Sequence, residues 1–158
     1  MSIISRFDLT GSVAVITGGG RGIGRAIALA YAEAGADVVL AARTLGDVEA
    51  VAQEVRLLGR RALALSCDVN DSEQRSALVT QAREHMGSIT HLVNNAGGAG
   101  PNDPLTLSVE RFEEIMRFNV SSAYHLCQLC VPHMRAAGAG NIINITSGAA
   151  RYAQTQFS

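Results

Sequence analysis

A glycine-rich segment near the N-terminus has the composition of a phosphate-binding turn. Residues 17–24 (Thr-Gly-Gly-Gly-Arg-Gly-Ile-Gly) follow an apolar run at 13–16 and lead into a helical pattern at 22–34. Glycine has no Cβ, so the backbone can turn sharply and approach a ligand closely. The first N–H groups of the helix and the positive end of its dipole would then face an anion. The segment therefore predicts a nucleotide-binding site.

The spacing of the glycines defines the turn more closely. Gly18, Gly22 and Gly24 form a Gly-x-x-x-Gly-x-Gly pattern, which differs from the general dinucleotide fingerprint Gly-x-Gly-x-x-Gly. An ordinary strand-to-helix turn is the alternative, but the preceding strand and the following helix favour cofactor binding. The expected cofactor contacts in this segment are Thr17, Gly18, Gly20, Arg21, Gly22, Ile23 and Gly24.

The residue after the second predicted strand, at 37–42, bears on which dinucleotide is bound. A carboxylate there would bond the ribose hydroxyls of NAD(H), whereas an arginine accommodates the 2′-phosphate of NADP(H). The strand ends in Ala-Ala-Arg, so Arg43 is available and no carboxylate stands at the tip. A guanidinium grips a phosphate with two N–H groups, and Arg21 could add a second positive charge. NADP(H) is favoured, and NAD(H) stays the alternative because Asp47 is close in the sequence.

Motifs spread over residues 17–147 resemble the short-chain dehydrogenase/reductase family, classical type. The matches are the cofactor turn at 17–24, the adenine-contacting pair Asp68 and Val69, the Asn-Asn-Ala-Gly motif at 94–97, the helix asparagine Asn119 and the active-site serine Ser147. The run at 97–101 is also similar to that of 7α-hydroxysteroid dehydrogenases. The resemblance implies an NAD(P)-dependent oxidoreductase that interconverts a secondary alcohol and a ketone.

Two later loops contain the further cofactor contacts that the resemblance implies. Asp68 would accept a hydrogen bond from the adenine amino group, although the same carboxylate could instead cap the next helix. Asn94 would bond backbone groups of the neighbouring strands, or belong to a tight turn. Small residues after it would leave room for the ribose. The expected contacts in these loops are Asp68, Val69, Asn95, Ala96 and Gly97.

Asn119 and Ser147 are the catalytic residues that the resemblance implies. Asn119 falls inside a helical pattern, where asparagine is unfavourable and needs a partner when buried. In the family this residue holds a water that relays protons. Ser147 would hydrogen-bond a substrate carbonyl, whereas a serine considered alone would be a turn residue. The family completes its site with a tyrosine and, four residues later, a lysine that lowers the tyrosine pKa.

The chain departs from the family at this tyrosine–lysine pair. It contains no lysine, since all 13 of its basic residues are arginine. Tyr152 is too close to Ser147, and Gln156 occupies the position four residues later. We therefore expect this stretch to bind the cofactor without turnover, as the N-terminal part of an NADP-dependent oxidoreductase whose C-terminal helix and strands are missing. A non-catalytic nucleotide-binding or regulatory module and one half of a split enzyme are the alternatives.

Alternating strand and helix patterns must position these residues. The expected strands are 13–17, 37–42, 62–66, 89–93 and 141–146, and the expected helices are 22–34, 45–58, 71–86 and 108–136. Strands such as 38–40 are apolar on both faces, which is typical of a parallel sheet covered by helices on each side. The pattern predicts one α/β domain over residues 1–158: a doubly wound, Rossmann-like, three-layer parallel sheet that is incomplete at its C-terminal end.

Composition and charge limit the classes of partner that we expect the chain to bind. The chain is 47% hydrophobic and 17% charged, and its net charge of −1 without a basic tract argues against nucleic-acid binding. No apolar run approaches the roughly 20 residues of a membrane span. The N-terminus lacks a secretion signal, so we expect no membrane partner and a cytoplasmic location.

The last expectations concern the cysteines, the substrate and the oligomeric state. Cys67, Cys127 and Cys130 are interpreted as packed, reduced thiols, and no metal site is expected. The resemblance implies a small alcohol or ketone substrate and a homo-oligomer that forms through the long helix at 108–136.

Overall fold

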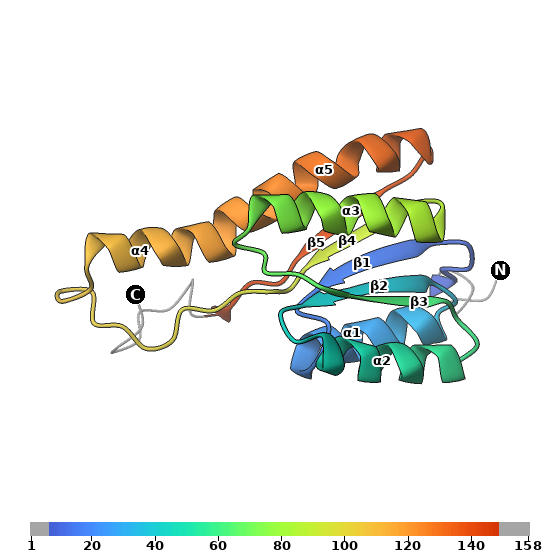
Figure 1. Cartoon of the computed structure of the whole chain (residues 1–158), viewed down its shortest axis with the longest axis horizontal. Coiled ribbons are helices and arrows are strands. Elements are labelled where there is room, and N and C mark those ends of the chain that lie inside the picture. The colour runs from blue at the N-terminus through green and yellow to red at the C-terminus, as the bar shows by residue number, and fades with distance from the viewer. Residues whose placement is uncertain (1–6, 149–158) are drawn as a thin grey trace.

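The computed structural model describes residues 7–148 and contains a parallel sheet with helices on both faces (Figure 1). Within this range the sheet has five strands in the order β3-β2-β1-β4-β5. In chain order the elements are β1 (Val13–Thr17), α1 (Gly22–Glu33), β2 (Asp37–Ala42), α2 (Leu45–Leu57), β3 (Ala62–Ser66), α3 (Ser72–Met86), β4 (His91–Asn94), α4 (Val109–Met116), the π-helical turn η2 (Arg117–Ser121), α5 (Ser122–Ala136) and β5 (Asn141–Asn144). Tyr152 and Gln156 lie outside the described residues.

The central strands are buried on both faces, as their continuous apolar runs predict. Alternate residues of β1 and β2 point to opposite sides of the sheet. Val15 and Val39 pack in the layer under α3 and α5, and Ile16 and Leu40 pack in the layer under α1 and α2. The prediction of a doubly wound, three-layer α/β fold is therefore confirmed.

Helix ends follow local capping rules. Asp71 precedes α3 and accepts hydrogen bonds from the N–H groups of Glu73 (2.8 Å) and Gln74 (3.1 Å). The backbone bond from Gln74 is the main reason that the pKa of Asp71 is lowered. Gly87 ends the same helix in the left-handed region, with φ of 84°. Asp71, and not Asp68, therefore caps α3.

The prediction of one continuous helix over 108–136 was wrong in detail. Ser108 does cap its start, accepting from Arg111 N at 3.2 Å, but a π-helical turn over Arg117–Ser121 divides it. Such turns carry an extra residue and often mark functional positions. Asn119 lies in this turn, which gives its side chain a direction that a regular helix would not provide.

The fourth strand is shorter at its start than predicted because a side chain replaces one of its ladder bonds. Thr90 Oγ1 accepts from Val13 N at 2.9 Å, so the strand begins at His91 and not at residue 89. It extends to Asn94, one residue beyond the prediction, whereas β5 ends at Asn144. No helix within residues 7–148 combines the length and the apolar content needed to cross a membrane.

Candidate functional site

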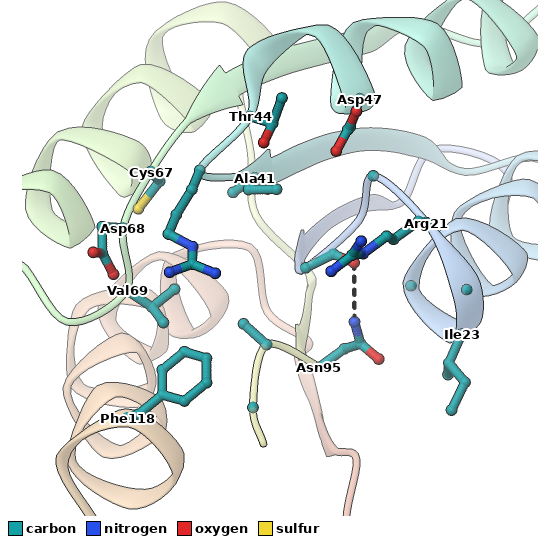
Figure 2. A pocket seen from close by; sticks show the side chains of 18 residues that line it. Arg21, Ile23, Ala41, Thr44, Asp47, Cys67, Asp68, Val69, Asn95 and Phe118 are labelled. Atoms are coloured by element: carbon teal, nitrogen blue, oxygen red, sulfur yellow. Dashed lines mark hydrogen bonds between the residues drawn. The ribbon is translucent and has the colours of Figure 1, made fainter. Parts of the chain in front are cut away.

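Loops at the carboxyl ends of β1 to β4 enclose a cleft of about 430 Å³ (Figure 2). Figure 2 shows Asp68 and Val69 on one side of this cleft and Arg21 and Ile23 on the opposite side. Among the predicted cofactor contacts, the following line it: Gly18, Gly20, Arg21, Gly22, Ile23, Gly24, Arg43, Asp68, Val69, Asn95, Ala96 and Gly97. Parallel strands end together at one edge of the sheet, and this brings contacts far apart in sequence into one site.

The glycine turn leaves backbone groups exposed to a ligand. Gly18 and Gly22 have φ of 64° and 54°, a region that other residues adopt at a cost. A Cβ on Gly24 would lie 2.1 Å from the Gly18 carbonyl oxygen, so the start of α1 can approach the turn only through glycine. A Cβ on Gly22 would meet no atom within 4 Å, because the backbone there borders open space.

The first turn of α1 has the properties of an anion site. Arg21, at the N-cap, makes no side-chain capping bond, and the first turn contains no acidic residue. By contrast, Asp71 and Ser108 cap α3 and α4 with their own side chains. The first N–H groups of an α-helix have no partner inside the helix. A phosphate group fits this site because it would satisfy those groups and the positive end of the helix dipole.

Thr17 does not line the cleft, and its role differs from the direct contact that the sequence suggested. Its side chain lies beneath the turn, and the residue is 1% exposed. The hydroxyl accepts from the N–H groups of Asn95 and Ala96, both at 3.0 Å, and donates to the Val93 carbonyl at 3.3 Å. Thr17 therefore holds the loop after β4 against the end of β1.

Replacing Thr17 with valine is expected to destabilise the protein by about 2–4 kcal/mol, because two part-buried N–H groups lose their acceptor and the Val93 carbonyl loses a donor. Urea unfolding followed by circular dichroism measures this loss. Thr80→Val is the matched control, since Thr80 is exposed on α3. Equal unfolding midpoints for the two variants would show that the hydroxyl of Thr17 is not the anchor described above.

The backbone bonds that the sequence suggested for Asn94 are made by Asn95, which also lines the cleft as predicted. The side chain of Asn95, not that of Asn94, bonds the neighbouring backbone, donating to the carbonyls of Thr17 (2.9 Å) and Gly18 (3.1 Å). Asn94 donates instead to Asn144 Oδ1 at 2.9 Å and to Cys127 Sγ at 3.7 Å. Adjacent residues of an extended segment point to opposite sides, so only one of the pair can face the glycine turn.

Two arginines line the cleft, Arg21 and Arg43. Within residues 7–148, neither Arg21 nor Arg43 takes part in an ion pair, whereas Arg25 pairs with Glu54. The Arg43 backbone is held in place, because its carbonyl accepts from Ser66 Oγ at 3.1 Å. Asp47 also lines the cleft. The site therefore offers two guanidinium groups to an anionic ligand, together with the carboxylates of Asp47, in the first turn of α2, and Asp68.

Asn119 and Ser147 lie outside the lining of this cleft. Asn119 holds the loop after β4: its Nδ2 donates to the Gly98 and Ile115 carbonyls at 3.0 and 2.8 Å, and its Oδ1 accepts from Gly98 N at 2.8 Å. A Cβ on Gly97 would come within 2.7 Å of Asn119 Oδ1, which explains the glycine. Ser147 follows β5 and is exposed.

The cysteines are packed thiols. Cys67 contributes to the cleft wall but is only 2% exposed, and burial raises its pKa to about 11. Burial also raises the pKa of Cys130 to about 12. Such thiols stay protonated near neutral pH and are poor nucleophiles. No group of three or more metal-ligating side chains occurs in the part of the chain that the structure describes.

Sequence reasoning missed several residues of the cleft wall. These are Ala41, Ala42, Thr44, Cys67 and Phe118, whereas Asp47 was noted only as a carboxylate near Arg43. Most are neighbours of predicted contacts on the same loops, so the positions of the strand ends could have indicated them. Phe118 could not be found in this way, because it comes from η2 and reaches the cleft only through the tertiary fold.

Comparisons with known proteins agree with this geometry. A family profile described as short chain dehydrogenase matches residues 12–158. An uncharacterised oxidoreductase of Mycobacterium tuberculosis is 43% identical over 157 residues, covering 99% of this chain and 60% of the relative. The 7α-hydroxysteroid dehydrogenase of Escherichia coli K12 is 42% identical over 142 residues, covering 90% of this chain and 55% of that protein.

A solved structure of 7α-hydroxysteroid dehydrogenase, complexed with NADH and 7-oxo glycochenodeoxycholic acid, superposes with a TM-score of 0.94 at 38% identity. The match covers 99% of this chain and 61% of that one. The chain therefore spans between 55% and 61% of the length of these three relatives.

Proposed function

The chain belongs to the short-chain dehydrogenase family of oxidoreductases, and from this premise we propose that its cleft binds NADP(H) in preference to NAD(H). The observation that carries the proposal is Arg43, which stands at the tip of β2 without an ion-pair partner in residues 7–148. A carboxylate at this tip would repel a 2′-phosphate, whereas a guanidinium binds it. The solved structure of a relative is a complex with NADH. The preference for NADP(H) is therefore inferred from Arg43 of this chain and not from that relative.

Different residues of the cleft would hold different parts of the dinucleotide. The glycine turn and the uncapped first turn of α1 would hold the pyrophosphate. Asp68 and Val69 would hold the adenine, and the segment from Asn95 to Gly97 would lie along the ribose on the nicotinamide side. When bound, the nicotinamide supplies or accepts the hydride. The chain's own task is to orient it and to exclude water.

For the whole protein we propose that a secondary alcohol and a ketone are interconverted. Ser147 would hydrogen-bond the substrate oxygen, and Asn119 would hold the water that relays protons. Asn119 is already bonded to the Gly98 backbone, so the same side chain would also fix the loop beside the substrate. We place the protein in the cytoplasm, with a small-molecule substrate.

For these 158 residues taken by themselves, we propose nucleotide binding without catalysis. The 158 residues contain no lysine, and the family's proton-donating tyrosine depends on a nearby lysine. We therefore expect these residues to bind the cofactor without oxidising or reducing a substrate.

Titration of the protein with NADPH and with NADH, followed by cofactor fluorescence, tests the binding proposal. NADPH should bind on the order of 10-fold or more tightly, because a charge-assisted bond to its 2′-phosphate is worth about 1.5–3 kcal/mol. Absence of binding by both cofactors would refute the proposed function. Equal affinities would refute the preference alone. Turnover of NADPH with added ketones would show that the residues present are sufficient for catalysis.

We propose that the apolar side of the long helix joins two copies of the chain. Helix α4 projects past the sheet and buries none of its residues (Figure 1). Exposed apolar side chains continue along it into α5: Val109, Phe112, Met116, Val120 and Tyr124. Their spacing of three or four residues places them along one side of a helix. An exposed apolar stripe of this length is typical of an interaction surface.

The double substitution Phe112→Glu and Val120→Glu is expected to shift the protein toward monomer, because two charges would have to be buried at the interface. Sedimentation velocity over a concentration series measures the change. Leu57→Glu is the control, because Leu57 is 88% exposed on α2, at the other face of the sheet. An unchanged association state in the double variant would exclude this side of the helix as the interface.

A further inference from the structure

The turn after β3 is held by side chains from the first turn of α3. Gln74 Oε1 accepts from Asp68 N at 2.9 Å, and Asp71 N donates to the Asp68 carbonyl at 3.0 Å. Asp68 Oδ1 accepts from Asn70 N at 2.9 Å, which leaves Oδ2 of the same carboxylate without a hydrogen-bond partner in residues 7–148. The Asp68 carboxylate therefore has one oxygen that fixes its orientation and one that remains available on the cleft.

Arg75, in the same turn of α3, holds this segment from inside the protein. The residue is only 8% exposed. Its Nη1 donates to the Val69 carbonyl, and its Nε donates to His125 Nδ1 on α5 at 2.9 Å. Within residues 7–148 it makes no ion pair with a carboxylate. Arg75 therefore links the Asp68–Val69 segment to α5, which packs against α3.

A buried guanidinium that pairs with no carboxylate costs more free energy than an apolar side chain in the same space between two helices. Burying a charge costs free energy unless the group is well hydrogen-bonded, and an apolar side chain of similar volume would fill the same space. What the arginine adds is direction, because its planar fork fixes one carbonyl oxygen and one imidazole nitrogen at the same time. The carbonyl that it fixes belongs to Val69, which lines the cleft.

We propose that Arg75 is a positioning residue for the adenine end of the dinucleotide. It contacts no ligand itself. By holding the Val69 carbonyl against α5, it sets the place of the Asp68 carboxylate, which would read the exocyclic amino group of adenine. The inference rests on the proposed function, since it requires a dinucleotide in the cleft.

The test compares NADPH with its hypoxanthine analogue, in which a carbonyl oxygen replaces the adenine amino group. A carboxylate accepts a hydrogen bond from an amino group and repels a carbonyl oxygen. The native protein should therefore bind NADPH on the order of 10-fold more tightly than the analogue. In Arg75→Met, where the carbonyl and the carboxylate are no longer held, the affinity ratio should fall toward one. Dissociation constants come from titrations followed by fluorescence.

Two further variants keep the test decisive. Arg83→Met is the matched control: Arg83 also lies on α3 and donates to a backbone carbonyl, that of Gly87, outside the cleft lining. Its ratio should equal that of the native protein. His125→Phe keeps a ring of similar size but removes the acceptor for Arg75 Nε. Its ratio should also fall, and it provides the test if Arg75→Met does not fold.

The outcomes separate this inference from the proposed function. A merely structural Arg75 would lower both affinities or the melting temperature and leave their ratio unchanged, and that result in a folded Arg75→Met or His125→Phe variant would overturn the inference. A native protein that binds the two dinucleotides equally would overturn it as well, because the carboxylate would then read no amino group. Failure of the native protein to bind either dinucleotide would overturn the proposed function itself.

Discussion

Gly24→Ala is expected to lower the affinity for NADPH by on the order of 100-fold, which corresponds to about 2.7 kcal/mol. The new Cβ would lie 2.1 Å from the Gly18 carbonyl oxygen and 2.6 Å from Asn95 Nδ2. The first of these is a backbone atom, so the clash can be relieved only by moving α1 or the turn. Either movement displaces the N–H groups that would hold the pyrophosphate.

The same substitution should also destabilise the fold, by about 1–3 kcal/mol, as is usual when a packed site is overfilled. Gly46→Ala is the control, because a Cβ on Gly46 would meet no atom within 4 Å and the residue lies in helix α2, outside the cleft lining. That variant should keep its cofactor affinity and gain stability, since alanine is the better helix former. Calorimetric titration and thermal melts of both variants measure the two effects. Native affinity in Gly24→Ala would exclude close packing at this glycine as the basis of the site.

The parts of the fold that depend on local pattern could be predicted from the sequence. The strands Val13–Thr17, Asp37–Ala42 and Ala62–Ser66 have the predicted bounds, because each is a largely apolar run bounded by turn or loop residues. The lining of the cleft followed from the same reasoning, since ligands bind where parallel strands end. For example, Arg43 and Asp68 each follow directly after, or shortly after, such a strand and do line the cleft.

Other features depend on contacts that no local pattern contains. The link from Arg75 to His125 joins residues 50 positions apart, and each looks like an ordinary surface residue of a helix when the sequence is considered alone. Strand pleating decided that Asn95, and not Asn94, bonds the backbone of the glycine turn, so a shift of one residue changed which side chain makes the predicted backbone bonds.

The role of Thr17 also depends on a contact that the local sequence does not contain. Its hydroxyl could have faced a ligand or the protein interior, and only the folded loop after β4 provides the two N–H groups that draw it inward. Likewise, the π-helical turn at Arg117–Ser121 needs one extra residue within a helix whose hydrophobic pattern is otherwise continuous. The sequence therefore predicted which segments form the site better than it predicted the task of each side chain.

Arg43→Asp is expected to invert the cofactor preference, lowering the affinity for NADPH by on the order of 100-fold and raising that for NADH severalfold. The change removes a guanidinium–phosphate bond worth about 1.5–3 kcal/mol and replaces it with a repelling carboxylate, which can instead accept bonds from the ribose hydroxyls of NADH. The backbone should not move, because the bond from Ser66 Oγ is to the Arg43 carbonyl. Titration of each variant with both cofactors gives the ratio of affinities.

Arg135→Asp makes the same change of charge near the end of α5, outside the cleft, and controls for the net charge of the protein. Its cofactor ratio should match that of the native protein, because charges separated by more than about 10 Å are largely screened at 0.1 M salt. If Arg43→Asp also kept the native ratio, Arg43 would not bind the 2′-phosphate. Arg21 would then be the next residue to test, since it is the other arginine on the cleft without an ion pair in residues 7–148. A ratio that changed in Arg43→Asp alone would assign the preference to the tip of β2.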